Sequence, residues 1–168
     1  MKRVISLFLV MLILGTIFAV FAAGYLDGNN TGYNFDIVGG KAVITGYTGN
    51  SSSLSIPSSV KYNNTNYSVT KIGDYAFAGR SSIITSLTLP STLTEIGEGA
   101  FSTTNNIYSS SMSNTTLTIP ANVTKIGARA FHSWVKLKTL TFASGSKCTT
   151  IGKYAFRNCQ ALSSVTLR

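Results

Sequence analysis

Apolar and polar positions recur along the chain in one repeated phrase. Val69 begins the string VTKIGDYAF, and close copies follow as LTEIGEGAF, VTKIGARAF and CTTIGKYAF. The isoleucines of the four copies stand at Ile72, Ile96, Ile126 and Ile151, at spacings of 24, 30 and 25 residues. A period of this size is typical of solenoids, in which stacked neighbours bury apolar faces that a single repeat cannot bury alone. The pattern therefore predicts a stack of coils.

Each phrase is followed by a short segment in which apolar residues alternate with Ser or Thr. The copies read SLTLP, TLTIP, TLTF and SVTL, and a weaker copy, SLSIP, begins at Ser53. Alternation with a period of two predicts a short strand with one face inward. We expect one such strand per repeat, each stacked in parallel on the next. Pro90 and Pro120 lie just past the strands, where a missing N–H does not interrupt the ladder.

The phrase itself forms the remainder of each predicted coil. Its recurrent glycine (Gly73, Gly97, Gly127 and Gly152) permits a sharp bend or a positive φ. The Ala-Phe pair that ends the phrase predicts a short helical or 3-10 turn, with the Phe ring filling the space between coils. The one spacing of 30 residues is explained by the polar loop STTNNIYSSSMSNTT, because insertions in solenoids map to loops.

Two hairpins are predicted before and within the first repeat. The segment YNFDIVGGKAVITGY reads as two strands around Gly39 and Gly40, placed to cap the N-terminal end of the solenoid. The segment VKYNNTNYSV, residues 60–69, predicts a second hairpin inserted into the degenerate first repeat. The predicted organisation is a cap over residues 24–52 and repeats over residues 53–168, about four plus the degenerate one.

The first 23 residues predict an apolar signal helix. Lys2 and Arg3 precede an uncharged and almost wholly apolar run from Val4 to Ala23. The small residues of VFAAG suit signal-peptidase cleavage after Ala22 or Ala23. The alternative is an uncleaved anchor, because about 20 apolar residues can span a bilayer.

Charge beyond the leader is positive and scattered. Without Lys2 and Arg3, twelve basic and five acidic residues remain, a net charge of +7. Few acids and many Ser, Thr and Asn residues indicate an extracellular surface, with a weak attraction to anionic glycans or cell-wall polymers. Nucleic-acid binding is not predicted, because no basic run carries interleaved aromatic residues.

Catalytic chemistry is poorly represented in the sequence. His132 is the only histidine, and no residues are marked as a nucleophile with its base. Metal-binding spacing of His and Cys is absent from the sequence. We therefore predict a protein that is not an enzyme, with no catalytic residue, cofactor or metal site.

Cys148 and Cys159 are the only cysteines. Export makes a disulfide between them chemically feasible. Cys148, however, occupies the column of Val69, Leu93 and Val123, where a small apolar filler is expected. We favour two buried free thiols over a bridge, a choice that only the geometry decides.

Two groups of positions are candidate ligand contacts. Hydroxyl residues flank the central apolar residue of every strand, which predicts two ladders with a spacing of about 4.8 Å. The alternative is that such residues simply suit the solvent side of a sheet. Variable columns near the turns contain Tyr, Trp and Arg, the types that most often anchor interfaces, although Trp134 also fits core packing. The candidates are Tyr75, Arg80, Thr88, Thr118, Arg129, Trp134, Thr141, Tyr154 and Thr166.

The strings LPSTLTEIGEGAF and AFRNCQALSSVTL resemble the BspA-type leucine-rich repeats of bacterial, protist and some archaeal surface proteins. The resemblance covers about residues 52–168. Cys159 matches the Cys column of the family, which is normally core, whereas Arg80, Thr104 and Trp134 depart from it. The resemblance implies a secreted or surface-attached repeat protein that binds other macromolecules, without naming a ligand. We expect a non-enzymatic binding or adhesion module whose partner is an extracellular protein or glycan. A membrane would be contacted only through an uncleaved leader.

The printed chain stops at SSVTLR, directly on a predicted strand. An uncapped solenoid end exposes an apolar coil and a strand edge, which favours association between copies. A structural protein that assembles end to end is therefore the alternative to a binding or adhesion module. A hydrolase is the third and least supported class, because it needs a site that the sequence does not show.

Overall fold

The computed structural model describes residues 20–25, 32–78, 80, 84–102 and 114–167. It contains thirteen strands and, within those residues, no helix. Most of the predicted signal helix lies outside the described residues, and residues 20–25 at its end form a strand, β1. No helix of the described part is long and apolar enough to cross a membrane. The strands are β1 Val20–Tyr25, β2 Tyr33–Val38, β3 Lys41–Tyr47, β4 Ser53–Ser55, β5 Ser59–Tyr62, β6 Thr65–Ile72, β7 Ser86–Thr88, β8 Glu95–Ile96, β9 Thr116–Ile119, β10 Lys125–Ile126, β11 Thr139–Phe142, β12 Thr150–Ile151 and β13 Ser164–Leu167.

Both predicted hairpins are confirmed at the N-terminal end. Strands β2 and β3 pair antiparallel through Gly39 and Gly40, whose φ angles are 57° and 71°. Strands β5 and β6 pair antiparallel through Asn63 and Asn64, with φ of 47° and 61°. Two consecutive positive φ values match the right-handed twist of a two-residue hairpin. Since β3 also pairs in parallel with β6, the first hairpin covers the first coil of the repeats.

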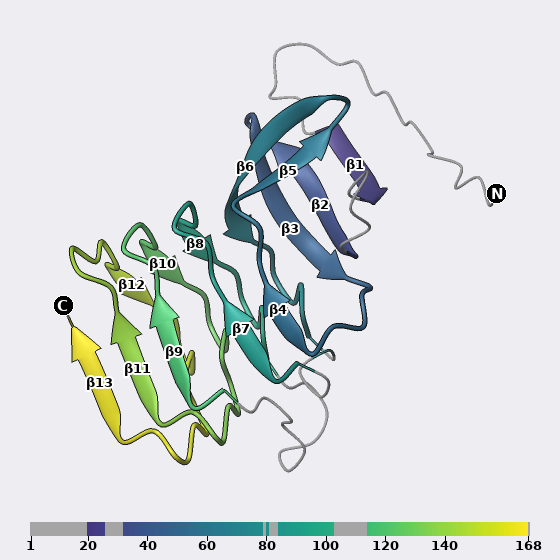
Figure 1. Ribbon diagram of the computed structural model, residues 1–168. Coiled ribbons are helices and arrows are strands. Elements are labelled where there is room, and N and C mark those ends of the chain that lie inside the picture. Colours follow the sequence, from purple (N-terminus) through teal and green to yellow (C-terminus); the bar gives the residue numbers. More distant parts are fainter. Residues whose placement is uncertain (1–19, 26–31, 79, 81–83, 103–113, 168) are drawn as a thin grey trace.

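The repeats form a stack of parallel strands, as predicted, with two strand ladders rather than one (Figure 1). The alternating segments form β4 and β7 in one sheet and β9, β11 and β13 in another. The prediction of one strand per repeat was incomplete, because the Ile of each phrase also belongs to a strand. Ile72 ends the eight-residue β6, and the other three isoleucines lie in the two-residue strands β8, β10 and β12. These strands pair in the order β6, β8, β10, β12 within the sheet that also contains β1, β2 and β3, with Ile72 opposite Ile96 and Ile126 opposite Ile151.

A column of aromatic rings runs through the interior. Neighbouring Phe rings stack face to face, with centroids 4.9 Å apart for Phe77 and Phe101 and 5.5 Å apart for Phe101 and Phe131. Phe156 continues the column at 5.3 Å from Phe131. The predicted role of the Phe column is therefore confirmed. Because each ring contacts the coil on either side, the column joins successive coils through buried apolar area.

The recurrent glycines have a different purpose from the predicted one. None of Gly73, Gly97, Gly127 and Gly152 has a positive φ. A Cβ atom on Gly127 would lie 2.5 Å from the backbone nitrogen of Glu98, and one on Gly152 would lie 2.4 Å from that of Ala128. Glycine is required here because the backbones of adjacent coils approach too closely for any side chain.

The turn after each glycine is not helical in the described residues. The residue two positions past the glycine takes a left-handed conformation instead: φ is 55° at Tyr75, 55° at Gly99, 53° at Arg129 and 64° at Tyr154. Such a residue interrupts a right-handed helix. The predicted helical or 3-10 turn is thus replaced by single turns, such as the hydrogen bond from Ala78 N to Tyr75 O at 2.9 Å.

Both cysteines are free thiols, as favoured, although neither is fully buried. The Sγ atom of Cys159 lies 3.5 Å from the carbonyl oxygen of Phe131, on the preceding coil. Burial raises the pKa of the Cys159 thiol to about 11. Since the thiolate is the reactive form, both the position and the pKa indicate a packing residue rather than a nucleophile.

Candidate functional site

The residues at the left-handed position of each phrase form a row along one edge of the solenoid, here called the turn ridge: Tyr75, Gly99, Arg129 and Tyr154. All of them are exposed except Gly99, which is buried. Backbone hydrogen bonds hold the row in register, since Tyr75 N donates to Glu98 O at 2.8 Å and Arg129 N donates to Lys153 O at 3.0 Å. Tyr75 and Tyr154 remain 50% and 39% exposed. The fold therefore presents these variable residues outward on a rigid frame.

Tyr75 is fixed in place by the next coil. Its hydroxyl donates to Glu98 Oε1 at 2.7 Å. The ring lies across Gly99, where an added Cβ would come within 2.4 Å of Tyr75 Cε1. The hydrogen bond to Glu98 raises the pKa of the Tyr75 phenol. The phenol is thus neutral at ordinary pH, and the glycine in this row is explained by the ring that covers it.

The other half of the ridge is basic. Arg129 Nη1 lies 3.5 Å from Glu98 Oε1, and its guanidinium carbon lies 5.7 Å from the centre of the Tyr154 ring. Lys153 Nζ and the guanidinium carbon of Arg157 lie 4.7 and 4.9 Å from the same ring centre. Cations at these distances are attracted by the ring quadrupole. Tyr154 therefore gathers three positive charges around one exposed aromatic ring.

The candidate threonines line up on the strand side, but their ladder is interrupted. Thr118, Thr141 and Thr166 are successive partners in β9, β11 and β13, and Thr88 pairs with Ser55 in β4. No hydrogen bond joins β7 to β9 among the described residues. The predicted hydroxyl ladder therefore exists as two separate pieces, with Thr88 in one and the other three candidates in the second.

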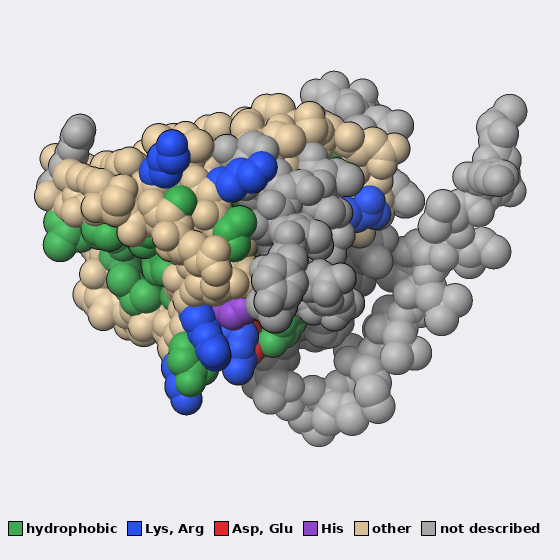
Figure 2. All heavy atoms as spheres, turned by 90° about the horizontal axis from the view of Figure 1, so that it is seen from below, with side chains coloured by type: hydrophobic (Ala, Val, Ile, Leu, Met, Phe, Trp, Pro, Cys, Tyr) green, Lys and Arg blue, Asp and Glu red, His purple; other side chains and the backbone are tan. Residues whose placement is uncertain are grey.

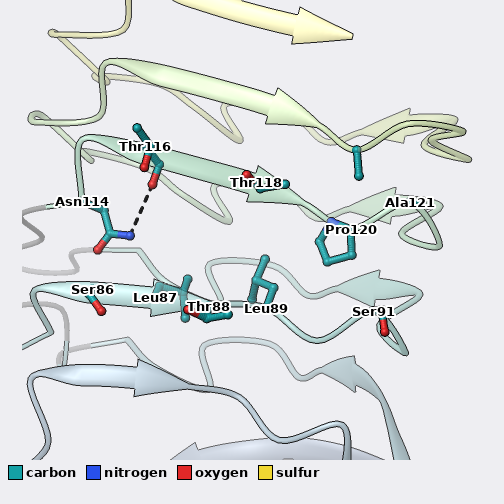
Figure 3. A pocket seen from close by; sticks show the side chains of 11 residues that line it. Ser86, Leu87, Thr88, Leu89, Ser91, Asn114, Thr116, Thr118, Pro120 and Ala121 are labelled. Atoms are coloured by element: carbon teal, nitrogen blue, oxygen red, sulfur yellow. Dashed lines mark hydrogen bonds between the residues drawn. The ribbon is translucent and has the colours of Figure 1, made fainter. Parts of the chain in front are cut away.

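A shallow groove with a volume of about 670 Å³ lies at this interruption, between β7 and β9. Ser86, Asn114 and Thr116 line its polar end, and Leu89 and Pro120 extend toward each other at its apolar end (Figure 3). Asn114 Nδ2 donates to Thr116 O at 3.4 Å, a long hydrogen bond. Nothing in the groove combines a charged group with a buried donor, so it is a weaker candidate site than the turn ridge.

Two of the predicted contacts lie away from both surfaces. Trp134 is wholly buried: its Nε1 donates to Phe101 O at 3.0 Å, and its ring packs edge-on against Phe131 at 5.0 Å. Trp134 is therefore a core residue and not a ligand contact, which corrects its place among the candidates. Arg80 is half-buried and is not part of the turn ridge.

The environment of His132 does not resemble a catalytic one. Its Nδ1 lies 2.9 Å from Ser133 Oγ, but Ser133 is only 1% exposed and cannot reach a substrate. No carboxylate hydrogen-bonds the ring among the described residues. Burial lowers the pKa of His132, and the neighbouring Arg157 and Arg129 lower it further. No group of three or more His, Cys, Asp or Glu that could hold a metal ion occurs in the described part of the chain.

Sequence reasoning missed three residues that contact the tyrosines of the ridge: Glu98, Lys153 and Arg157. A signal for them was present, because they also occupy variable columns. Glu98 and Lys153 directly precede the left-handed position, and Arg157 directly follows the Phe of its phrase. What the sequence could not show is that these columns converge on the tyrosine rings, since that depends on the direction of each turn.

Comparison with known proteins agrees with the architecture. The family model described as the BspA type leucine rich repeat region matches residues 47–168 in six copies. A leucine rich cell surface protein from Faecalibacterium prausnitzii is 30% identical, with a TM-score of 0.61 over 84% of this chain and 42% of that protein. A leucine-rich repeat protein from Bacteroides capillosus is 29% identical, with a TM-score of 0.66 over 82% of this chain and 95% of that protein.

A leucine-rich repeat protein from T. pallidum shares the fold at 21% identity, with a TM-score of 0.59 over 80% of this chain and 68% of that protein. No curated protein matches the chain. The chain spans about two fifths of the length of the F. prausnitzii protein. The repeated phrase, the parallel coils and the match over residues 47–168 lead to one conclusion: the chain belongs to the BspA-type leucine-rich repeat family.

Proposed function

We propose that this protein is an exported, cell-surface binding module that contacts an extracellular protein or glycan through its turn ridge and performs no catalysis. The observation that carries the proposal is the division of the repeat into constant and variable positions. The constant Ile, Ala and Phe residues are buried in the first three phrases, whereas Tyr75, Arg129 and Tyr154 are exposed in one row. Tyr and Arg are enriched among residues that anchor interfaces, and a rigid backbone lowers the entropic cost of binding.

A binding array of matrix proteins and glycans tests this proposal with two matched double variants. Tyr75→Asn/Tyr154→Asn removes two rings from the ridge, and Asn tolerates the left-handed backbone at both positions. Thr118→Ala/Thr141→Ala alters the strand side by a similar number of exposed groups. We expect the tyrosine variant alone to lose binding. Loss only in the threonine variant would place the site on the strand side, and saturable binding to no ligand would contradict the proposal.

Two observations support the extracellular part of the proposal. Residues 1–23 have the basic start and apolar run of a signal peptide. The F. prausnitzii relative is described as a cell surface protein. Mass spectrometry of the mature protein from an exporting host gives its N-terminus. We expect cleavage after Ala22 or Ala23. An intact Met1 in a membrane fraction would instead indicate the anchored form.

End-to-end association is a second candidate, supported by the apolar surface of the last described coil. Ile151, Val165 and Leu167 are 53%, 58% and 77% exposed, although their counterparts in preceding coils are buried. Apolar exposure favours self-association when it lies next to a strand edge that has no partner among the described residues, as the outer edge of β13 does. Light scattering of the 168-residue chain across concentrations tests this directly. A constant monomer mass would contradict it, and a mass that rises in the wild type but not in Val165→Ser/Leu167→Ser would support it.

A further inference from the structure

Charge is distributed very unevenly along the chain. All five acidic residues lie at or before Glu98. Residues 99–168 contain eight Lys and Arg residues and no Asp or Glu. Among the described residues, Lys125 and Arg129 pair with Glu95 and Glu98 of the preceding coil, and the later coils otherwise carry a positive field. Such a field attracts anions over about 8 Å at physiological ionic strength.

Part of this charge gathers at the end of the turn ridge, in a cluster called here the basic patch: Arg129, Lys153 and Arg157. Figure 2 shows Lys and Arg side chains grouped beside the single histidine, whereas the other visible basic side chains stand apart. The cluster surrounds Tyr154, with cation-to-centroid distances of 4.7 to 5.7 Å. Lys153 and Arg157 have no carboxylate within 4.0 Å among the described residues. Glu98 pairs with Arg129 at 3.5 Å, whereas all three cations surround the Tyr154 ring.

The single histidine, His132, lies beside the patch (Figure 2). It lies one residue past Phe131, and both Arg157 and Arg129 act on its ring to lower its pKa after the larger effect of burial. Ser133 Oγ contacts its Nδ1, and Asn158 Nδ2 donates to the same Ser133 oxygen at 3.1 Å. The ring is therefore held still beside the patch, where it can report a change in local charge.

We infer that the basic patch binds an acidic polysaccharide, through sulfate or carboxylate groups on adjacent sugars. The three cations come from two successive coils, and strands of adjacent coils are separated by about 4.8 Å. A polymer with regularly spaced anionic groups matches that arrangement better than one small anion does. Nucleic acid fits less well, because single-stranded binding relies on bases stacked on aromatic faces. The face of Tyr154 already carries the cations.

This inference rests on the proposed binding function and adds the chemical class of its ligand. The test measures affinity for a sulfated heparin oligosaccharide, with the desulfated, N-acetylated oligosaccharide and a DNA oligonucleotide as comparisons, at physiological salt. Lys153→Gln/Arg157→Gln removes two charges from the patch. Lys41→Gln/Lys61→Gln removes the same number from the N-terminal hairpins, and thermal unfolding checks that both variants fold.

We expect the patch variant to bind the sulfated oligosaccharide about twofold to thirtyfold more weakly, the range for two exposed ion pairs, and the hairpin variant to bind it normally. Equal loss in both variants would show an effect of net charge alone and overturn the inference. Equal affinity for the oligonucleotide would overturn the assignment to polysaccharide. Binding to other ligands of the array, without binding to the sulfated oligosaccharide, would overturn this inference but leave the proposed function intact.

The single histidine gives an independent measurement. Bound anions would offset Arg129 and Arg157, so the pKa of His132, followed by its proton NMR signal, should rise when the sulfated oligosaccharide is added. The desulfated oligosaccharide should leave the titration unchanged. Binding without any change at His132 would place the ligand elsewhere and overturn the inference.

Discussion

The solenoid has two long sides: the turn side, which carries the Ile strands of the repeated phrases, and the strand side, which carries the alternating Ser/Thr strands. On the turn side, β6, β8, β10 and β12 form one continuous parallel ladder, whereas on the strand side the ladder stops between β7 and β9. The same coils supply both sides. Residues 103–113 are inserted in the chain between β8 and β9, so the coil that contains them reaches β9 only after the insertion. The repeated phrase, which forms the turn side, therefore holds the coils together, while the strand side tolerates an interruption.

The first prediction concerns stability: core residues next to the turn side should contribute more to the free energy of unfolding than core residues next to the strand side. Phe101→Ala removes a ring that stacks on both Phe77 and Phe131, and we expect it to lower the free energy of unfolding by about 3–5 kcal/mol. Leu87→Ala, at the interrupted strand side, should cost about 2 kcal/mol, because Leu87 is already 8% exposed. Denaturant unfolding of both variants measures the difference, and equal losses would contradict the comparison.

A second test concerns close contact between coils. Gly127→Ala places a Cβ atom 2.5 Å from backbone atoms of Gly97 and Glu98, which no rotamer can relieve. We expect a loss of about 2–3 kcal/mol. Gly145→Ala is the control, since its added Cβ meets nothing within 4 Å and its cost of about 1 kcal/mol comes from φ alone. A milder effect at Gly127 than at Gly145 would show that the glycine is not needed for packing.

Hydrogen exchange gives a third, smaller contrast. On the turn side, Gly97 N donates to Ile72 O at 2.8 Å and Gly127 N donates to Ile96 O at 2.7 Å. On the strand side, no such hydrogen bond joins β7 to β9 among the described residues. We therefore expect the opening free energy, as measured by hydrogen exchange, to be about 1 kcal/mol higher for peptides that contain β8 and β10 than for those that contain β7. Uniform protection across both sides would remove the contrast.

The smallest effect is a dependence on pH at the turn side. Glu95 lies 3.3 Å from Lys71 and 3.0 Å from Lys125, so one carboxylate links three coils. Burial alone would raise the pKa of the Glu95 carboxyl, but hydrogen bonds from Lys125 and Lys71 outweigh it and hold the pKa below its ordinary 4.5. A lowered folded-state pKa stabilises the fold above pH 4.5, and this stabilisation disappears as the pH falls through the lowered value.

The contribution of this exposed network is a few tenths of a kcal/mol, about what exposed ion pairs provide. Unfolding curves between neutral pH and pH about 3 should show it in the wild type and not in Glu95→Gln, since the amide does not titrate. An identical acid response in both proteins would exclude the network as its source.

Much of the architecture could be predicted from the repeated phrase. The columns of Val69, Ile72, Ala76 and Phe77 identify the core of the first three phrases, because a position that stays apolar in every coil is buried by the stacking of the next coil. The hairpin turns at Gly39 and Asn63 were equally legible, since few other residues accept consecutive positive φ values. The second, two-residue strand of each coil was not predicted, because such a short segment has no period of its own.

The site was less predictable than the fold. Tyr75, Arg129 and Tyr154 were found as a variable column, but nothing in their side chains indicated a left-handed backbone, which Tyr and Arg rarely adopt. Trp134 stands in the same column as Arg80, yet it is buried and Arg80 is not. The neighbouring coil decides such a case, through the carbonyl oxygen of Phe101 that accepts the indole hydrogen bond.

By itself the sequence determined the solenoid, because its periodic apolar positions can be buried only by stacking one coil on the next. It also determined the family, through residues that packing keeps constant. Only the tertiary structure showed why each phrase has a glycine and which contacts its variable residues make. Asp74 and Tyr75 of the first phrase both reach the next coil, where Asp74 Oδ1 accepts from Glu98 N at 2.8 Å and Tyr75 donates to the Glu98 carboxylate. Contacts between coils depend on register and turn direction, which no single copy of the phrase contains.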